Sequence, residues 1–346
     1  MRYIIIGAGA IGGTIGGLLS ESGSEVVLVA RGAHYEALRD GGLRISTPEG
    51  ARTLALPVAD GPAAVELRPD DVLVLTVKTQ DSGAALDAWG ARPVAGTGAT
   101  AAEVLPLVCA QNGVESERLA LRRFRRVYGM CVWLPATFLE PGSVAAAGSP
   151  LTGMLHIGRY PSGTDSTARQ ISADLEKAAF EAPVVADVMR WKYAKLLSNL
   201  ANSLQAACGV HGTDPAADAL MEGLVQQAEA EGRAVYAAAG TEAASAEEQR
   251  RTRADKITLL PVEGQRRGGG SSWQSLSRGT GSIEADFLNG EIALLGRLHG
   301  VPTPVNDVLQ RVANAFAREH RPAGSMPAAE LAALVADEVR RGSGSG

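Results

Sequence analysis

The first third of the chain alternates short apolar runs with helical patterns. Short runs rich in Val, Ile and Leu occupy residues 3–6, 25–29, 71–77 and 104–110. A small-residue helical pattern over residues 10–22 separates the first two runs. Apolar strands alternating with helices are typical of a parallel sheet that is covered on both faces. The pattern therefore predicts an α/β domain of the Rossmann type at the N-terminus.

The pattern changes in the second half of the chain. Gly and Pro turns interrupt residues 132–157, which predicts antiparallel strands at the edge of the first domain. From about residue 167 onward the apolar periodicity is helical. It predicts helices over residues 189–207, 214–239, 282–298 and 304–318.

These patterns predict an α/β Rossmann-type domain followed by an all-α domain. We place the first domain over residues 1–180 and the helical domain over residues 181–340, with the boundary near 175–185. The glycine-rich segment 265–270 is expected to be a mobile loop, and the tail 341–346 a disordered end.

Composition narrows the function classes. The 346 residues are 45% apolar and 21% charged, which suits two folded domains. The net charge of −5 argues against a nucleic-acid partner. No apolar run approaches the roughly 20 residues that cross a bilayer. The three cysteines lack C-x-x-C spacing and are typical of reduced thiols. We expect a cytoplasmic protein without a metal or membrane partner, and consider a homodimer.

A glycine-rich turn follows the first predicted strand. Gly7, Gly9 and Gly12 form G-x-G-x-x-G at the mouth of a helix, with Ala8, Ala10 and Ile11 between them. Such glycines allow a tight turn, close approach of a pyrophosphate and close packing of helix on strand. The helix N-terminus then offers free N–H groups to the anion. A βα turn without a ligand is the alternative.

The end of the second strand indicates which dinucleotide would bind. Sites for NAD place an acid here, which accepts hydrogen bonds from the ribose. This chain has Arg31 instead, and a guanidinium can bind a 2′-phosphate through two hydrogen bonds. The sequence therefore predicts NADP(H). An exposed loop arginine without a ligand would give the same pattern.

Two further polar residues follow central strands. Lys78 ends the run VLVLTVK, and Asn112 follows VLPLVCAQ and precedes Gly113. Ligands of open α/β sheets bind at the carboxyl edge of the strands, where both residues are expected. A solvated lysine and an ordinary Asn-Gly turn are the alternatives.

A polar stripe runs along the predicted helix 189–207. Lys195, Asn199 and Asn202 lie at i, i+4 and i+7 and share one face, with Ser203 at its margin. Four leucines make the rest of this helix apolar. A lysine and two amides on such a helix predict a wet cleft between the domains, and a solvent-facing stripe is the alternative. Downstream lie Ser272, the second of a serine pair, and Glu284, which periodicity alone also explains as a helix-start acid.

Taken together, these segments resemble the ketopantoate reductases (2-dehydropantoate 2-reductases) over roughly residues 1–320. The resemblance rests on motifs that occur in the same order: GAGAIG, VLVAR, LTVKTQD, AQNGV, KLLSN, SSW and IEADFLNG. It implies NADPH-dependent reduction of 2-dehydropantoate in pantothenate biosynthesis.

The resemblance also implies roles for the residues singled out above. The three glycines would bind the pyrophosphate and Arg31 the 2′-phosphate, while Lys78 and Asn112 would line the cofactor and substrate cleft. Lys195 would be the general acid, Glu284 would hydrogen-bond the substrate hydroxyl, and Asn199 and Ser272 would bind substrate. The helices would bring Lys195 and Glu284 into one site across the domain interface.

Two departures from the family pattern affect substrate choice. Family members often carry Asn at i+8 from the lysine, where this chain has Ser203 beside Asn202. They can also carry a polar residue where this chain has Gly269. Both Asn202 and Ser203 are kept as candidate substrate-binding residues. The alternatives are a reductase of another keto acid, a 3-hydroxyacid dehydrogenase of the 6-phosphogluconate type, or a non-catalytic NADP(H) sensor.

Overall fold

The computed structural model describes residues 1–210, 212, 214–253, 256–264, 269–279 and 281–343. The chain folds into two compact units. The first comprises Met1–Lys192 and Ala244–Gln265, and the second comprises Tyr193–Ala243 and Arg266–Gly346. The first unit therefore extends beyond the expected boundary at 175–185 and also recruits a later segment. The predicted loop 265–270 lies mostly outside the described residues.

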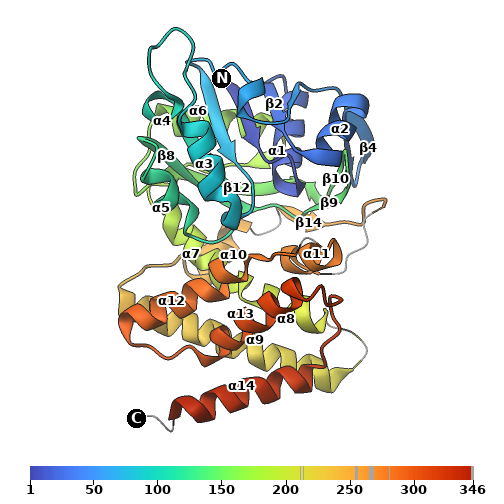
Figure 1. The fold of residues 1–346 in the computed structure, drawn as a ribbon, viewed down its shortest axis with the longest axis vertical. Coiled ribbons are helices and arrows are strands. Elements are labelled where there is room, and N and C mark those ends of the chain that lie inside the picture. The colour runs from blue at the N-terminus through green and yellow to red at the C-terminus, as the bar shows by residue number, and fades with distance from the viewer. Residues whose placement is uncertain (211, 213, 254–255, 265–268, 280, 344–346) are drawn as a thin grey trace. The chain divides into compact units, whose positions relative to one another are not determined.

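The first unit is built on an eight-stranded sheet with the order β13-β12-β8-β7-β6-β1-β2-β5. Figure 1 draws this unit with strands β2, β8 and β12 labelled among its helices. Neighbouring strands run parallel, except that β12 is antiparallel to β8. This confirms both the Rossmann-type domain and the antiparallel edge. The strands are β1 (Arg2–Ile6), β2 (Glu25–Val29), β5 (Val58–Ala59), β6 (Asp71–Leu75), β7 (Pro106–Cys109), β8 (Arg126–Trp133), β12 (Gly153–Arg159) and β13 (Phe180–Glu181).

Helices cover both faces of this sheet because alternate residues of each strand point to opposite sides. Tyr3 and Ile5 of β1 pack in a core with α1 (Ala10–Glu21) and α6 (Ser166–Lys177). Ile4 and Ile6 pack in a second core against α3 (Ser82–Gly90), α4 (Ala101–Val104) and α5 (Ser116–Leu121). Both sides of β1 are thus buried, as its unbroken apolar sequence predicts.

The chain changes direction at β1. It passes from β1 to β2 on one side and later crosses to β6 on the other side of β1. The loops after β1 and β6 therefore lie together at the carboxyl edge of the sheet, at the switch point where open α/β sheets bind ligands. The glycine turn and Lys78 follow these two strands.

Two smaller sheets complete the first unit. One has the order β4-β3-β10-β9 and contains β3 (Leu43–Thr47), β4 (Gly50–Leu54), β9 (Ala136–Glu140) and β10 (Ser143–Ala146). The other pairs β11 (Gly148–Pro150) with β14 (Ile257–Leu259). The remaining elements are α2 (Gly32–Gly41), η1 (Pro62–Ala64), η2 (Thr79–Asp81) and α10 (Ala246–Arg253).

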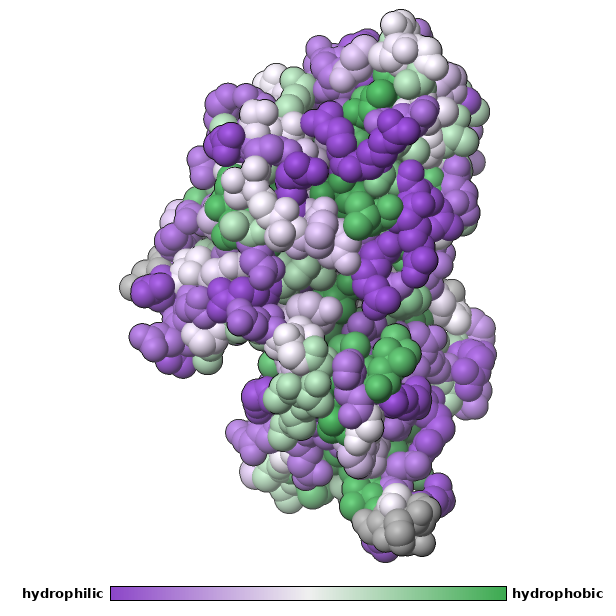
Figure 2. Space-filling view, turned by 90° about the vertical axis from the view of Figure 1, so that its left-hand side faces the viewer, coloured by the Kyte–Doolittle hydropathy of each residue, from purple (hydrophilic) through white to green (hydrophobic). Residues whose placement is uncertain are grey.

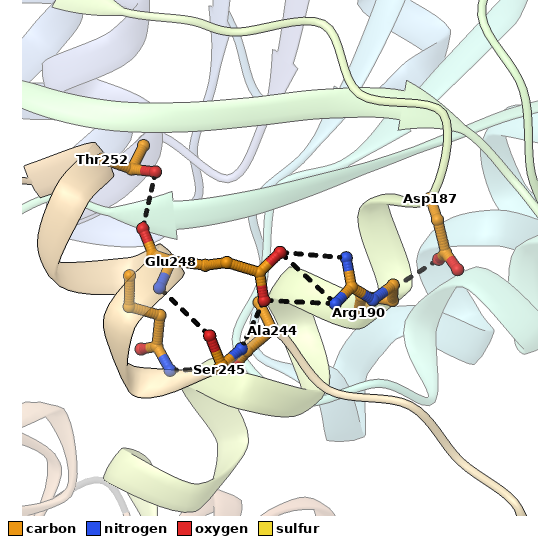
Figure 3. Close-up of polar contacts among 7 residues, drawn as sticks. Asp187, Arg190, Ala244, Ser245, Glu248 and Thr252 are labelled. Carbon is orange, nitrogen blue, oxygen red and sulfur yellow. Dashed lines mark hydrogen bonds and ion pairs between the residues drawn. The ribbon is translucent and has the colours of Figure 1, made fainter.

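We call residues 244–264 the returning segment, because they rejoin the first unit from the helical half of the sequence. Its helix α10 begins with a capping box, in which Ser245 and Glu248 each accept a hydrogen bond from the other's backbone N–H. The Glu248 carboxylate also forms an ion pair with Arg190 at 3.2 Å (Figure 3). Further along, Lys256 pairs with Glu181 at 2.6 Å. These contacts fix the segment on the first unit.

The second unit is helical, which confirms the predicted all-α half. Its elements are α8 (Ala201–Cys208), α9 (Pro215–Ala239), α11 (Ser271–Ser277), η3 (Glu284–Phe287), α12 (Asn289–His299), α13 (Pro304–Arg318) and α14 (Ala328–Ser343). Helix α7 (Val188–Asn199) begins in the first unit and ends in the second. The predicted helix 304–318 is confirmed, and 214–239 is confirmed with Asp214 as its N-cap.

Three predicted elements need correction. The helix predicted over 189–207 is divided at Leu200, and the helix predicted over 282–298 is divided at Leu288 into η3 and α12. At the first break the Leu200 N–H donates to the Leu197 carbonyl at 3.2 Å, which is a tighter turn than the α-helix, and Asn289 Nδ2 donates to the Leu200 carbonyl at 3.1 Å. The predicted disordered tail is helical up to Ser343, as the end of α14, and residues 344–346 lie outside the described residues.

Candidate functional site

The glycine turn after β1 has the geometry of a phosphate cradle. Gly7 has φ +108°, which favours glycine, and a Cβ there would lie 2.9 Å from the Val77 nitrogen. A Cβ on Gly12 would collide with the Gly7 carbonyl and the Thr76 hydroxyl. In contrast, a Cβ on Gly9 would meet nothing within 4 Å. Gly7 and Gly12 are therefore required by the fold itself, while Gly9 leaves open space where a ligand can approach.

Helix α1 presents an uncapped N-terminus at this turn. No side chain caps it, and its first turn contains no acidic residue. The first N–H groups of an α-helix have no partner within the helix, so they and the helix dipole favour an anion here. The residues present thus fit the pyrophosphate of a dinucleotide.

His34 holds the turn from outside. The Gly142 N–H donates to His34 Nδ1 at 2.9 Å, so the ring proton is on Nε2, which donates to the Ala8 carbonyl at 2.7 Å. Burial lowers the pKa of His34 below 6.5, which favours this neutral ring. Sequence reasoning did not find His34, because Gly142 lies 108 residues away. Its position three residues after Arg31 was the available signal.

Arg31 is the N-cap residue of α2 and lies two residues after the end of β2. Its side chain is exposed, and among the described residues it forms no ion pair that would occupy its guanidinium. The charge therefore lies at the end of the second strand, where the sequence analysis expected a group that binds the ribose phosphate.

The loops after β6 and β7 bring Lys78 and Asn112 to the same sheet edge. Lys78 precedes the short helix η2 and is half-buried, as is Asn112. Gln111 joins the two loops, because its Nε2 donates to the Val77 carbonyl at 2.7 Å and to Ser82 Oγ at 2.8 Å. Gly113 has φ +74°, so the Asn-Gly pair does form a turn. The turn and the ligand-binding role are compatible.

In the second unit, two predicted substrate-binding residues carry unsatisfied polar atoms. Asn199 Oδ1 and Ser272 Oγ are buried, and within the described part of the chain neither has a hydrogen-bond partner. Asn199 ends α7, and Ser272 lies in the first turn of α11, which packs on α8. Buried polar atoms are nearly always paired, so unpaired atoms indicate a ligand or water.

The two other candidates on α8 have different environments. Ser203 is 1% exposed and donates to Asn289 Oδ1 at 2.6 Å, so its hydroxyl is used within the protein. Asn289 also donates to Asn306 Oδ1 at 2.9 Å, which extends this buried network. Asn202 faces α11 instead, since a Cβ on Gly270 would lie 2.8 Å from its Oδ1.

The two predicted catalytic residues, Lys195 and Glu284, also belong to the second unit. Lys195 is half-buried in the last two turns of α7, and Glu284 opens η3 and is 4% exposed. The predicted residues therefore form two groups. Cofactor-binding candidates lie in the first unit, while the two catalytic candidates and most substrate-binding candidates lie in the second.

The described residues contain neither a candidate metal-binding cluster nor a candidate membrane-spanning helix. No group of three or more His, Cys, Asp or Glu side chains there is placed to hold a metal ion. None of the described helices combines the length and the apolarity that a membrane span needs. On the face drawn in Figure 2, hydrophobic residues form small patches separated by hydrophilic ones.

Comparison with known families decides the assignment. Residues 3–162 match the family model described as ketopantoate reductase PanE/ApbA, and residues 187–317 match the model of its C-terminal domain. The chain belongs to the ketopantoate reductase family. It is therefore an oxidoreductase, as the sequence motifs predicted.

Individual relatives agree over most of the chain. The 2-dehydropantoate 2-reductases of Pyrococcus horikoshii and Archaeoglobus fulgidus are each 29% identical, over 89% of this chain and 95% of theirs. Among solved structures, a PanE/ApbA family ketopantoate reductase from Ralstonia eutropha has a TM-score of 0.74 and 26% identity, covering 93% of this chain and all of its own. D-mandelate dehydrogenase with NADH and anilino(oxo)acetate has a TM-score of 0.75 at 21% identity, over 92% and 99%, which shows a shared fold.

Proposed function

We propose that this protein reduces a 2-keto acid with NADPH, and that 2-dehydropantoate is the substrate, giving pantoate for pantothenate biosynthesis. One observation carries the substrate assignment. The two buried atoms without partners in the second unit, Asn199 Oδ1 and Ser272 Oγ, belong to the residues expected to bind substrate. A keto acid with a carboxylate and a hydroxyl supplies partners for both.

The proposed cofactor is NADP(H). The uncapped N-terminus of α1 and the open space at Gly9 suit a pyrophosphate. The exposed guanidinium of Arg31 suits a 2′-phosphate, which an acid at this position would repel. Lys78 and Asn112 stand at the same sheet edge and complete the proposed cofactor and substrate contacts.

The proposed chemistry uses Lys195 as the general acid. NADPH, when bound, supplies the hydride that reaches the ketone carbon. The Lys195 ammonium stabilises the charge that develops on the ketone oxygen and donates a proton to it. The Glu284 carboxylate keeps this ammonium charged and accepts a hydrogen bond from the substrate hydroxyl. Ser272 donates to the substrate carboxylate, and Asn199 Oδ1 accepts from the new hydroxyl that forms at the reduced carbon.

Ser203 receives a different role in this proposal. Its hydroxyl donates to Asn289, so we assign it to the buried network that supports α8. Asn202 remains a substrate-facing candidate at the α8–α11 contact. Because the family's usual asparagine is absent at position 203, a 2-keto acid of another shape is the alternative substrate.

The test is NADPH oxidation with 2-dehydropantoate and a panel of neighbouring keto acids, with NADH in parallel. We expect the highest kcat/KM with 2-dehydropantoate and NADPH. A higher kcat/KM with another keto acid would keep the reductase and replace its substrate. An absence of turnover with every member of the panel would contradict the proposal.

A further inference from the structure

The first unit contains a buried ion pair that the proposed chemistry does not use. Lys192 on α7 binds Glu117 in the first turn of α5, and the two side chains are 2% and 0% exposed. Gly129 of β8 lies beside the pair, where a Cβ would lie 2.8 Å from Val188 Cγ1 and 3.3 Å from Glu117 Oε1. Burying two charges costs about as much as their attraction returns, so stability alone does not account for the pair.

The same lysine also holds the backbone at the sheet edge. Its Nζ donates to the Gln111 carbonyl oxygen at 3.1 Å. Gln111, 5% exposed, donates in turn to the Val77 carbonyl and to Ser82. One continuous chain of hydrogen bonds therefore runs from Lys192 to the two strand-end loops. Val77 directly precedes Lys78, and Gln111 directly precedes Asn112.

The buried Glu117 carboxylate depends on Lys192 for hydrogen bonding and for compensation of its charge. Its second oxygen, Oε2, is buried and has no hydrogen-bond partner within the described residues, and the same holds for Gln111 Oε1. Burial raises the pKa of Glu117, and the ammonium of Lys192 opposes this shift. The carboxylate thus has few other donors, and its charge holds the ammonium against the Gln111 carbonyl.

We propose that Lys192 is a positioning residue: held by Glu117, its ammonium fixes the Gln111 carbonyl and thereby the loops that present Asn112 and Lys78. The significance for turnover rests on the proposed function, which assigns Asn112 and Lys78 to the cofactor and substrate contacts. The position of the loops is a property of the first unit alone and can be tested separately.

The test compares two double variants with the parent. Lys192→Met/Glu117→Met removes the pair and its bond to Gln111 with little change in volume. The control, Arg2→Met/Asp71→Leu, removes another buried pair in which the arginine also holds a backbone carbonyl, that of Glu66 at 2.7 Å. Arg2 and Asp71 begin β1 and β6, at the opposite end of the strands. Amide hydrogen exchange at residues 111–114, kcat, KM and the melting temperature are measured for all three proteins.

We expect amides 111–114 to exchange at least about tenfold faster in the Lys192/Glu117 variant and not in the control. If the proposed function holds, kcat should fall about 10- to 100-fold because Asn112 and Lys78 are misplaced, and KM for the keto acid should change less. Unchanged exchange at 111–114 overturns the positioning role, whatever happens to turnover. If the parent protein shows no turnover, the proposed function is refuted. The exchange result then still decides whether Lys192 positions the loops.

A second variant guards against failure to fold. Gln111→Met keeps the ion pair and removes the donors to Val77 and Ser82. It should speed exchange at 111–114 and lower kcat in the same direction. If this folded variant exchanges like the parent, the hydrogen-bonded chain does not position the loops and the inference is wrong.

Discussion

At the scale of single residues, the glycines of the turn are required for different reasons. Gly12 is required by the packing of the protein itself, whereas Gly9 is expected to be required by the bound cofactor. A Cβ on Gly12 collides with the chain itself, whereas a Cβ on Gly9 meets open space. We expect Gly12→Ala to lower the melting temperature. Gly9→Ala should leave it close to the parent's and weaken NADPH binding at least about tenfold, because the new methyl group stands where the pyrophosphate approaches.

Fluorescence titration with NADPH and thermal unfolding of both variants check this prediction. Gly41→Ala provides a control outside the site, because Gly41 is exposed, has no positive φ, and its added Cβ would meet no atom within 4 Å. Parental NADPH affinity in Gly9→Ala would show that the open space is not the phosphate site.

His156 predicts a pH dependence of stability that is unrelated to catalysis. It is 1% exposed on β12, stacks on Trp191 with ring centroids 4.1 Å apart, and neither ring nitrogen has a hydrogen-bond partner within the described residues. Burial, with help from Arg253 and Lys256, lowers the pKa of His156 from 6.5 to about 4. The native state therefore keeps the ring neutral, while the unfolded chain takes up a proton below about pH 6.5.

Because only the unfolded chain takes up this proton, the free energy of unfolding falls as the pH falls. The His156 contribution is complete above pH 6.5 and is lost as the pH falls towards 4, by about 3 kcal/mol at most. His156→Phe, which keeps the stack on Trp191, should flatten the dependence of the unfolding free energy on pH across this interval. Urea unfolding at several pH values measures it, with exposed His299→Gln as a control that should keep the parental slope.

The same scale shows what the sequence could and could not reveal. The glycine turn and Arg31 were predictable because their chemistry lies within one βα unit. Lys192 and Glu117 were not, since 75 residues separate them and neither belongs to a local motif. His34 was missed for the same reason. Pairing across such separations depends on the tertiary fold, which periodicity does not encode.

At the scale of elements, helical periodicity located the helices but not their breaks. The apolar pattern continues through Leu200, so nothing local predicts that α7 ends at Asn199. At the break the Leu200 N–H donates to the Leu197 carbonyl, and the distant Asn289 donates its amide to the Leu200 carbonyl. Leu288 shows the second case, where φ −116° and ψ −89° separate η3 from α12. Both breaks involve side chains or backbone angles that an amphipathic pattern cannot specify.

The returning segment is an element whose attachment can be tested. Glu248 caps α10 and also pairs with Arg190, so Glu248→Ala removes both contacts (Figure 3). Losing the cap and the ion pair should lower the local stability of α10. Because α10 contains Arg250 and Arg251, native-state trypsin cleavage there should become about five- to thirtyfold faster.

The control for this experiment is Glu247→Ala, the neighbouring exposed acid on the same helix. Trypsin should cleave this variant at the parental rate, and the melting temperatures of both variants should stay near that of the parent. Equal cleavage of the Glu248 variant and the parent would mean that the strand pair β11–β14 holds the segment without α10.

At the scale of the whole molecule, the candidate groups are divided between the two units. The glycine turn, Arg31, Lys78 and Asn112 belong to the first, and Lys195, Asn199, Ser272 and Glu284 to the second. The sequence predicted this division of an α/β half from a helical half, because the change in periodicity is strong. It could not predict that the returning segment, residues 244–264, rejoins the first unit, since its attachment depends on ion pairs and one short strand pair.

This division predicts two separable classes of variant. Arg31→Ala should raise KM for NADPH much more than KM for NADH and leave kcat near the parent's, because it removes only a contact to the 2′-phosphate.

Variants in the second unit should behave differently. Lys195→Ala should lower kcat about 10²–10⁴-fold through loss of the general acid, and NADPH affinity measured by fluorescence titration should stay unchanged. Glu284→Ala should weaken use of the keto acid and likewise leave NADPH affinity unchanged. If either second-unit variant loses NADPH affinity as Arg31→Ala does, its side chain serves the cofactor, and the assignment of acid and substrate groups to the helical unit fails.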